Sequence, residues 1–328
     1  EIYVTTAHTS PNIMREIGRL RELSFATEGG GTGKEVDIDE FDLLPEPYCY
    51  KQLFVWSPED EEIVGGYRFI HGLDIARKPD GMLMSATAEL FQFTDTFIEK
   101  YMPDMVELGR SFVQPAFQPT TNFRKGMYSL DNLWDGLGAL AIQRPNMKYF
   151  FGKMTMYPEY NRQARDLIQH FLFKHFEDKE KLVIPIDPLV IETDKAYMDS
   201  ILTETEFKDD YKLLNAEVRR LGENIPPLVN SYMSLSPTMK MFGGGINHEF
   251  SEAEETCILI TFDEIYEAKK ARHIDSYIEE KIKRMRVRFP LFVENMGEDL
   301  KMRIAQKRDQ VQEKISKTLK NCLKCRFC

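Results

Sequence analysis

The order of apolar and polar positions predicts a strand, a helix and then a hairpin in the first 70 residues. Residues 1–7 (EIYVTTA) form a strand pattern, and residues 10–29 carry apolar side chains near a period of 3.6. Ser10 is the expected N-cap of that helix and Pro11 its first residue. Residues 50–70 contain two β-rich runs joined by an acidic turn, which predicts a hairpin. The GGGTG stretch at 29–33 lacks the lysine and hydroxyl residue of a phosphate-binding loop, so we expect a flexible connection.

The middle of the chain alternates between strand and helix patterns. The predicted elements are, in chain order, a helix at 127–143, a strand at 148–156, a helix at 161–176, a strand at 181–186, helices within about 195–235 and an apolar strand at 256–262. Strands that alternate with helices after an antiparallel hairpin predict an α/β or α+β class with a mixed sheet.

One strand pattern, ELGRSFVQP at 107–115, carries two charges that a buried strand does not need for packing. Side chains alternate between the two faces of a strand, so Glu107 and Ser111 are expected on one face and Arg110 and Phe112 on the other. A buried charge needs a partner or a chemical task. The strand is therefore either part of a functional site or the place of a structural ion pair.

Composition and charge limit the class of protein. The chain has 328 residues, of which 42% are hydrophobic and 29% charged, as in ordinary globular proteins. It shows no apolar run long enough for a spanning helix and no leader pattern, and its cysteines form no disulfide framework, so we expect a cytoplasmic protein. From residue 268 onward 17 Lys and Arg face 8 Asp and Glu, on a chain whose net charge is minus 10. This basic tail is expected either to be a solvated helical extension or to lie on an anionic membrane.

Several pieces taken together resemble one family. These are RELSF at 21–25, DIDEFD at 37–42, ELGRSFV at 107–113, LWDG at 133–136, YFFG at 149–152 and IPPLVNSYMSL at 225–235. In this order they resemble the ornithine-lipid or aminolipid synthase N-acyltransferases, often labelled hemolysin-like. That family is a branch of the GNAT superfamily related to the acyl-homoserine-lactone synthases. The resemblance covers residues 1–263, which implies a GNAT-like domain with a largely antiparallel mixed sheet and a helical insertion at about 195–235. Residues 264–328 would be a basic helical extension.

The resemblance implies an enzyme that moves a fatty acyl group, often 3-hydroxylated, from acyl carrier protein to the amine of an amino acid such as glycine or ornithine. No permanently bound cofactor is expected, because the donor is the acyl-phosphopantetheine of the carrier protein or acyl-coenzyme A. The pyrophosphate loop of many GNAT enzymes is absent after ELGRSFV, where the chain reads QPTTNFRKG, and this favours the carrier protein. The alternatives are a signal synthase of the homoserine-lactone type and a non-catalytic scaffold that binds acyl carrier protein or a membrane.

Glu107 is the expected general base, because an amine attacks a thioester only when it is neutral. Arg110 is the second catalytic candidate, either orienting the acidic residues or forming the structural ion pair. Ser111 shares the expected face of Glu107 and is assigned to substrate binding. GGGINHEF at 243–250 departs from the family pattern, which places an Asp shortly before the Phe, so a changed amino-acid preference is expected.

Arg21, Asp39 and Asp42 form a second group of candidates for substrate binding. An arginine can hold a carboxylate through two hydrogen bonds and an aspartate can hold an ammonium, which is what recognition of an amino acid requires. The alternative is a loop fastened by an Arg–Asp pair.

The remaining candidates concern the acyl chain and the donor. The residues expected to line an acyl channel, or else to be plain core, are Phe25, Trp134, Phe150 and Phe151. Arg124 and Lys125 are expected to meet the phosphopantetheine phosphate or the acidic carrier protein. We expect no metal: Cys322, Cys325 and Cys328 lack a fourth ligand. The expected partners are acyl carrier protein, the amino acid and an anionic membrane surface at the inner face, with no nucleic acid.

Overall fold

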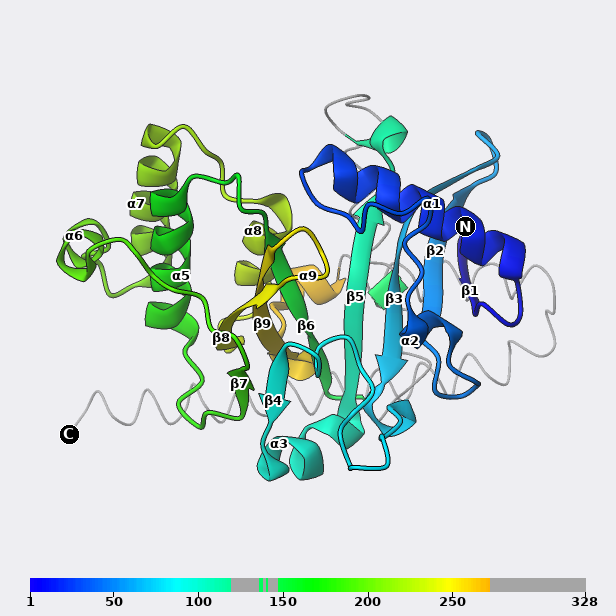
Figure 1. Ribbon diagram of the computed structural model, residues 1–328. Coiled ribbons are helices and arrows are strands. Elements are labelled where there is room, and N and C mark those ends of the chain that lie inside the picture. Colours follow the sequence, from blue (N-terminus) through cyan, green and yellow to red (C-terminus); the bar gives the residue numbers. More distant parts are fainter. Residues whose placement is uncertain (119–135, 138–139, 141–146, 272–328) are drawn as a thin grey trace. The chain divides into compact units, whose positions relative to one another are not determined.

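A seven-stranded sheet forms the centre of the fold in the computed structural model, which describes residues 1–118, 136–137, 140 and 147–271 (Figure 1). The strand order is β1-β2-β3-β5-β6-β9-β8. These strands are β1 (Ile2–Thr5), β2 (Lys51–Ser57), β3 (Glu62–His71), β5 (Met105–Val113), β6 (Tyr149–Met156), β8 (Lys240–Asn247) and β9 (Ala253–Thr261). Only β5 and β6 pair in parallel; the other neighbours are antiparallel. The predicted mixed, largely antiparallel sheet flanked by helices is confirmed.

Helices cover both faces of this sheet. One face carries α1 (Pro11–Thr27), α2 (Glu40–Leu43) and α3 (Asp95–Lys100), and the other carries α5 (Arg162–Phe176), α6 (Lys195–Ile201), α7 (Phe207–Arg220) and α8 (Pro227–Met233). The short α9 (Glu267–Lys270) follows β9, and β4 (Phe91–Phe93) pairs with β7 (Val183–Pro185) in a separate two-stranded sheet. The chain divides into two compact units, Glu1–Lys270 and Ala271–Cys328, and these helices and strands all belong to the first.

Alternation along β5 and β6 divides the core between the two faces. Val106 and Leu108 of β5, with Phe150 of β6, pack against α5, α7 and α8. Met105 and Phe151 point the other way and pack with residues of α2 and α3. The period of two therefore holds over the first half of β5, as the sequence predicts.

Most elements form where the apolar pattern predicts them. The strand at the N-terminus, the first helix, the hairpin of β2 and β3, strands β5, β6, β7 and β9 and helix α5 are confirmed. Strand β8 was not predicted, because its centre is Gly243, Gly244 and Gly245 and carries no apolar alternation. Two of the glycines are favoured there, because Gly243 has φ +107° and a Cβ on Gly244 would overlap Leu189.

The glycine-rich loop after α1 is fastened to that helix. Glu22 accepts hydrogen bonds from the backbone N–H and hydroxyl of Thr32, at 2.9 and 2.7 Å, and from the N–H of Gly33 at 2.7 Å. One carboxylate thus satisfies three donors of the loop, which was expected from the sequence to be a flexible connection. No helix among the described residues is long and apolar enough to span a membrane.

Candidate active site

A β-bulge in the middle of β5 sets the geometry of the candidate site. Gly66 of β3 pairs with Phe112, but Arg68 pairs with Gly109, so β5 holds one more residue than β3 over this interval. Arg110 lies in the bulge with φ +51°, a conformation rare for residues other than glycine. The extra residue reverses the alternation of side chains beyond Gly109.

The bulge brings Arg110 to the face that carries Glu107, so the expectation that they point to opposite faces is wrong. Arg110 forms an ion pair with Asp37, at 2.9 Å between Nε and Oδ2, and its guanidinium lies 4.2 Å from the ring centre of Phe250. Phe112 is reversed as well and packs under α1, beside Ile17. A strict period of two fails because it assumes a regular strand.

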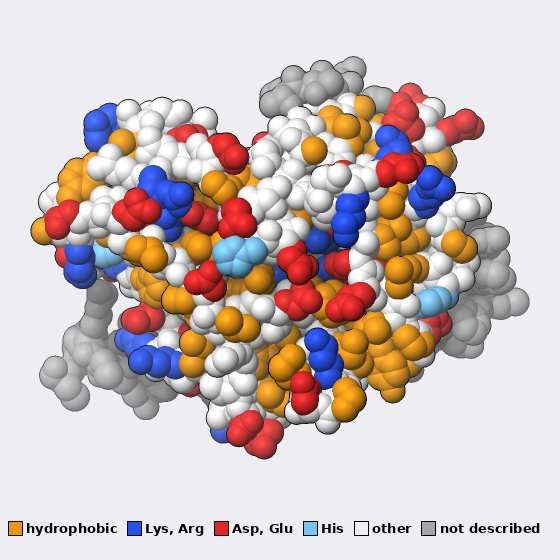
Figure 2. Space-filling model, viewed as in Figure 1, with side chains coloured by type: hydrophobic (Ala, Val, Ile, Leu, Met, Phe, Trp, Pro, Cys, Tyr) orange, Lys and Arg blue, Asp and Glu red, His pale blue; other side chains and the backbone are white. Residues whose placement is uncertain are grey.

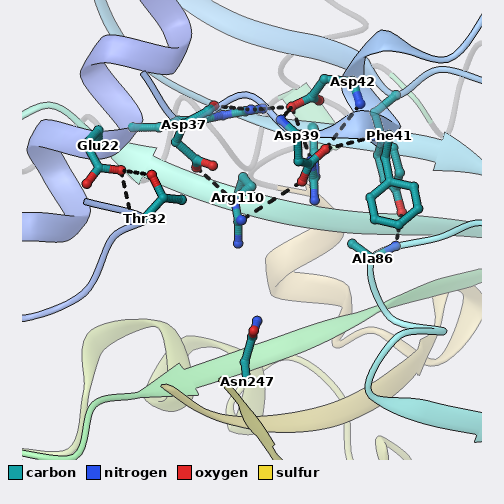
Figure 3. Close-up of polar contacts among 12 residues, drawn as sticks. Glu22, Thr32, Asp37, Asp39, Phe41, Asp42, Ala86, Arg110 and Asn247 are labelled. Carbon is teal, nitrogen blue, oxygen red and sulfur yellow. Dashed lines mark hydrogen bonds and ion pairs between the residues drawn. The ribbon is translucent and has the colours of Figure 1, made fainter. Parts of the chain in front are cut away.

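Three arginines and three aspartates form a closed, alternating arrangement on this face, called here the arginine–aspartate ring (Figure 3). Its successive contacts are Arg21–Asp42 at 3.2 Å, Asp42–Arg68 at 3.2 Å, Arg68–Asp39 at 2.6 Å, Asp39–Arg110 at 4.0 Å, Arg110–Asp37 at 2.9 Å and Arg21 to the Asp37 carbonyl at 3.5 Å. The ring has no net formal charge, which makes the burial of so many ions tolerable.

Accessibility differs around the ring. The side chains of Arg21 and Asp42 have no exposed surface, and both also contact Gln52. Asp39 and Arg110, by contrast, keep 27% and 16% of their side-chain surface exposed. Arg21 and Asp42 thus make the contacts expected if an Arg–Asp pair fastens a loop, which was the alternative to substrate binding. Asp39 and Arg110 lie where the ring is accessible.

Burial and neighbouring charges act against each other at Asp39. Burial alone would raise the pKa of its carboxyl, but the Arg68 guanidinium, followed by Arg110 and Arg21, lowers that pKa to about 2. Asp39 also accepts hydrogen bonds from the backbone N–H groups of Phe41 and Asp42, at 3.1 and 3.2 Å, and so caps α2. The ring therefore fixes the start of α2 above the site.

Glu107 is held by one of its two carboxylate oxygens. Its Oε1 accepts hydrogen bonds from the hydroxyl of Tyr50 at 2.7 Å, the hydroxyl of Thr87 at 2.8 Å and the N–H of Thr87 at 3.1 Å. Burial and the Glu107 carboxylate raise the pKa of Tyr50 well above its usual value, so the phenol remains a donor. The Oε2 atom is buried and has no hydrogen-bond partner among the described residues. A buried acceptor left without a donor is costly, which makes Oε2 a candidate position for a donor group of a ligand.

Strands β5 and β6 separate immediately beyond Glu107. Their parallel pairing runs from Met105 with Tyr149 to Leu108 with Gly152, although β5 continues to Val113 and β6 to Met156. Figure 1 shows the two strands close at one end and apart at the other. Gly152 allows the last close approach, because a Cβ there would lie 2.8 Å from the Leu108 carbonyl oxygen. Figure 2 shows acidic side chains gathered in the middle of the same face.

The remaining predicted residues fall into three groups. Phe25 packs edge-on against Phe250 with ring centres 5.4 Å apart, and Phe151 is buried in the core below α3. Ser111 is half-buried, next to Arg110 in the bulge. Arg124, Lys125 and Trp134 lie outside the described residues, as do the three terminal cysteines.

Sequence reasoning missed several residues of the site, Thr87 and Gln52 among them. Arg68 is a member of the arginine–aspartate ring, and Tyr50 donates a hydrogen bond to Glu107. Lys153 of β6 and Glu255 of β9 form a separate ion pair at 2.7 Å. The signal for Arg68, Lys153 and Glu255 was a charge inside a strand pattern, the same signal that singled out Glu107. Among the described residues no cluster of three or more His, Cys, Asp or Glu could hold a metal ion.

Comparison with known proteins identifies relatives of this chain. Residues 20–125 match the model of the acetyltransferase (GNAT) domain. The chain is 56% identical over 287 residues to a glycine N(alpha)-acyltransferase of Phocaeicola vulgatus, covering 88% of this chain and 87% of that protein. It is also 56% identical over 279 residues to a glycine N(alpha)-acyltransferase of Bacteroides thetaiotaomicron, covering 85% and 82%.

Solved structures give weaker similarities. The acyl-homoserine-lactone synthase LasI aligns with a TM-score of 0.36 at 11% identity, covering 79% of this chain and 90% of that one. An aminoglycoside 6'-N-acetyltransferase complexed with coenzyme A aligns with a TM-score of 0.33 at 11% identity, covering 79% and 96%. The sequence relatives are far closer, and by their identity and coverage this chain belongs to the GNAT N-acyltransferase family that includes the two glycine N(alpha)-acyltransferases.

Proposed function

We propose that this enzyme transfers a fatty acyl group from the phosphopantetheine thioester of acyl carrier protein to the amine of glycine, as a step in aminolipid synthesis. The acceptor is proposed from the names of the two relatives, which share 56% identity with this chain. The observation that carries the chemistry is the unpartnered, buried Oε2 of Glu107, beside the point where β5 and β6 part.

Glu107 acts as the general base in this proposal. The acceptor amine donates a hydrogen bond to Oε2, passes its proton to the carboxylate and attacks the thioester carbon as a neutral amine. Tyr50 and Thr87 hold Oε1, so the carboxylate cannot turn away from the amine. The tetrahedral intermediate then collapses as the phosphopantetheine thiolate leaves, and this thiolate takes the second proton from the acylated nitrogen, so that the products are the amide and the free phosphopantetheine thiol.

The separated strands supply the donor site. Beyond Leu108 and Gly152 the two strands no longer pair with each other, so backbone groups on both edges are available to a phosphopantetheine arm. Their N–H groups are suited to the oxyanion that forms on the thioester carbonyl. Arg124 and Lys125 are proposed to contact the carrier protein or the phosphate, and the basic tail an anionic membrane at which the acylated product is released.

The direct test is to incubate the purified protein with 3-hydroxypalmitoyl acyl carrier protein and a pool of common amino acids, and to look for N-acylated products by mass spectrometry. We expect N-acylglycine. A homoserine-lactone product in a parallel reaction with S-adenosylmethionine in place of the amino acids would replace the acceptor assignment. An intact thioester with a folded protein would overturn the transferase proposal and favour a binding scaffold.

Glu107→Gln tests the base within that assay. The amide keeps the volume and can still accept from Tyr50 and Thr87, but it cannot take a proton, so kcat/KM should fall about 100- to 10,000-fold. Glu99→Gln, an exposed change of the same chemistry on α3, is the matched control and should retain full activity. Retention of activity in Glu107→Gln would remove Glu107 from the mechanism.

A further inference from the structure

The acceptor amino acid has a carboxylate as well as an amine, and we propose that Lys153, backed by Glu255 and Asn247, binds it. This assignment rests on the proposed transfer to an amino acid and gives that reaction its carboxylate-binding subsite. Five features carry it: the incomplete coordination of Lys153, the Glu255–Asn247 pair behind it, its distance from Glu107, the room at Gly109 and the balance of charges.

Lys153 lies on β6, one residue beyond the end of the pairing with β5. Its ammonium donates to the Ala86 carbonyl at 2.9 Å and pairs with Glu255 Oε2 at 2.7 Å. An ammonium has three N–H donors, so these two partners leave one donor for a ligand. The side chain keeps 12% of its surface exposed, so Lys153 is not completely enclosed by the described residues.

Glu255 and Asn247 fix the lysine from behind. The Asn247 amide donates to Glu255 Oε1 at 2.7 Å, while Oε2 faces Lys153. Burial alone would raise the pKa of the Glu255 carboxyl, but Lys153, the Asn247 amide and Arg110 lower it below its usual value. Asn247 points toward Arg110 from the opposite side of the site (Figure 3). A charged pair with both carboxylate oxygens occupied is rigid, as a binding subsite must be.

A single peptide group connects Lys153 with Glu107. The carbonyl of Ala86 accepts from Lys153 at 2.9 Å, and the N–H of the same peptide group, on Thr87, donates to Glu107 Oε1 at 3.1 Å. With the bond lengths of a peptide, Nζ and Oε1 are at most about 8.5 Å apart. An α-amino acid that donates its amine to the Glu107 carboxylate and accepts from Lys153 at hydrogen-bond distance spans a similar length.

Gly109 leaves room for the ligand between these two groups. It lies two residues after Glu107 on the same face of β5, one residue beyond the last pair that joins β5 to β6, Leu108 with Gly152. Among the described residues, an added Cβ would meet only the Arg68 side chain, at 3.7 and 3.9 Å, and Gly109 has no left-handed backbone conformation. Neither packing nor backbone geometry requires glycine here, which is consistent with a position kept open for the acceptor.

The charges also favour Lys153 over the arginines. Arg21, Arg68 and Arg110 are matched one to one by the aspartates of the ring. On the other side, Lys153 is matched by Glu255, and Glu107 adds one negative charge without a cationic partner among the described residues. The unmatched negative charge of Glu107 favours binding of the acceptor's ammonium there. The carboxylate of the same amino acid then lies next to the free donor of Lys153.

The test compares glycine with glycinamide, which has the amine but no carboxylate, as acceptors from 3-hydroxypalmitoyl acyl carrier protein. We expect wild type to prefer glycine, with kcat/KM corrected for the fraction of neutral amine. In Lys153→Met the ratio of glycine to glycinamide should fall about 10- to 100-fold, mainly through KM for glycine. Lys153→Arg should restore part of the preference.

Lys240→Met is the matched control, because Lys240 is also a half-buried strand lysine paired with a carboxylate, Asp178, at 2.9 Å. Its glycine to glycinamide ratio should equal that of wild type. Should Lys153→Met fail to fold, the pair Lys153→Gln with Glu255→Gln removes both charges and is expected to lose the same preference.

Each outcome bears on one proposal. An unchanged ratio in a folded Lys153→Met, or equal losses with both acceptors, would overturn the carboxylate subsite and leave the lysine a structural role. A wild-type enzyme that acylates neither compound would instead overturn the proposed function on which the subsite rests.

Discussion

Asp42→Asn is the sharpest test of the arginine–aspartate ring, because it removes one charge and almost no volume. Asp42 is fully buried and receives Arg21 and Arg68 at Oδ2, both at 3.2 Å, and the Gln52 amide at Oδ1, at 2.8 Å. In the variant an amide NH2 must face one of these donors. The ring would also keep three cations with only two anions.

The cost follows from the unpaired positive charge left in the interior. Removing one partner of a buried ion pair typically costs about 3–5 kcal/mol. For a domain of this size, each kcal/mol lowers Tm by about 2–4 °C, so a fall of about 6–20 °C is expected. Circular dichroism during heating measures Tm, and urea unfolding measures the free energy of unfolding.

Two further variants decide whether the reasoning is right. Glu35→Gln removes a charge from an exposed ion pair with Arg15 and should leave Tm within about 2 °C of wild type. Arg21→Met combined with Asp42→Asn restores the charge balance, so the double variant should be less destabilised than the two single losses added together. Strict additivity, or an Asp42→Asn protein as stable as wild type, would show that the ring carries no coupled charge.

Two further predictions concern pH and the glycines. The pKa of Asp39 in the folded protein, about 2, lies below its unfolded value, so its stabilisation is complete above about pH 4 and is lost as the pH falls toward 2. When the pH is lowered from about 5 to 2.5, the free energy of unfolding measured with urea should therefore fall more for wild type than for Asp39→Asn. Gly72→Ala should be strongly destabilised, because its Cβ would overlap the Met102 carbonyl oxygen, whereas Gly109→Ala should keep its Tm and lose activity. A cooperative, wild-type-like melt of Gly72→Ala would contradict the packing at that turn.

The sequence reveals the fold well because the two core faces of the sheet depend on local alternation. A period of two places Val106 and Leu108 on one face of the sheet and Met105 and Phe151 on the other, as the structure shows. The charged residues of β5 are recognisable for a related reason, since apolar strands contain few charges without partners. Glu107 and its neighbourhood could therefore be singled out before any coordinates.

The partners of those charges could not be predicted in the same way. Lys153 and Glu255 are far apart in the sequence and meet only because β9 returns beside β6. The burial of Arg21 depends on how α1 lies over Gln52 of β2. The bulge could not be predicted from a glycine at the position with positive φ. That position is occupied by Arg110, which is held by Asp37.

The bulge makes the length of this segment more important than the identity of its residues. Phe112 reaches the core beneath α1 only because the bulge adds one residue to β5 between Glu107 and Phe112. A deletion of one residue here would preserve a plausible strand and yet turn Phe112 toward the opposite helices. Relatives with this site should therefore keep the number of residues from Glu107 to Phe112 constant, so that an alignment gap at this point would indicate a different architecture.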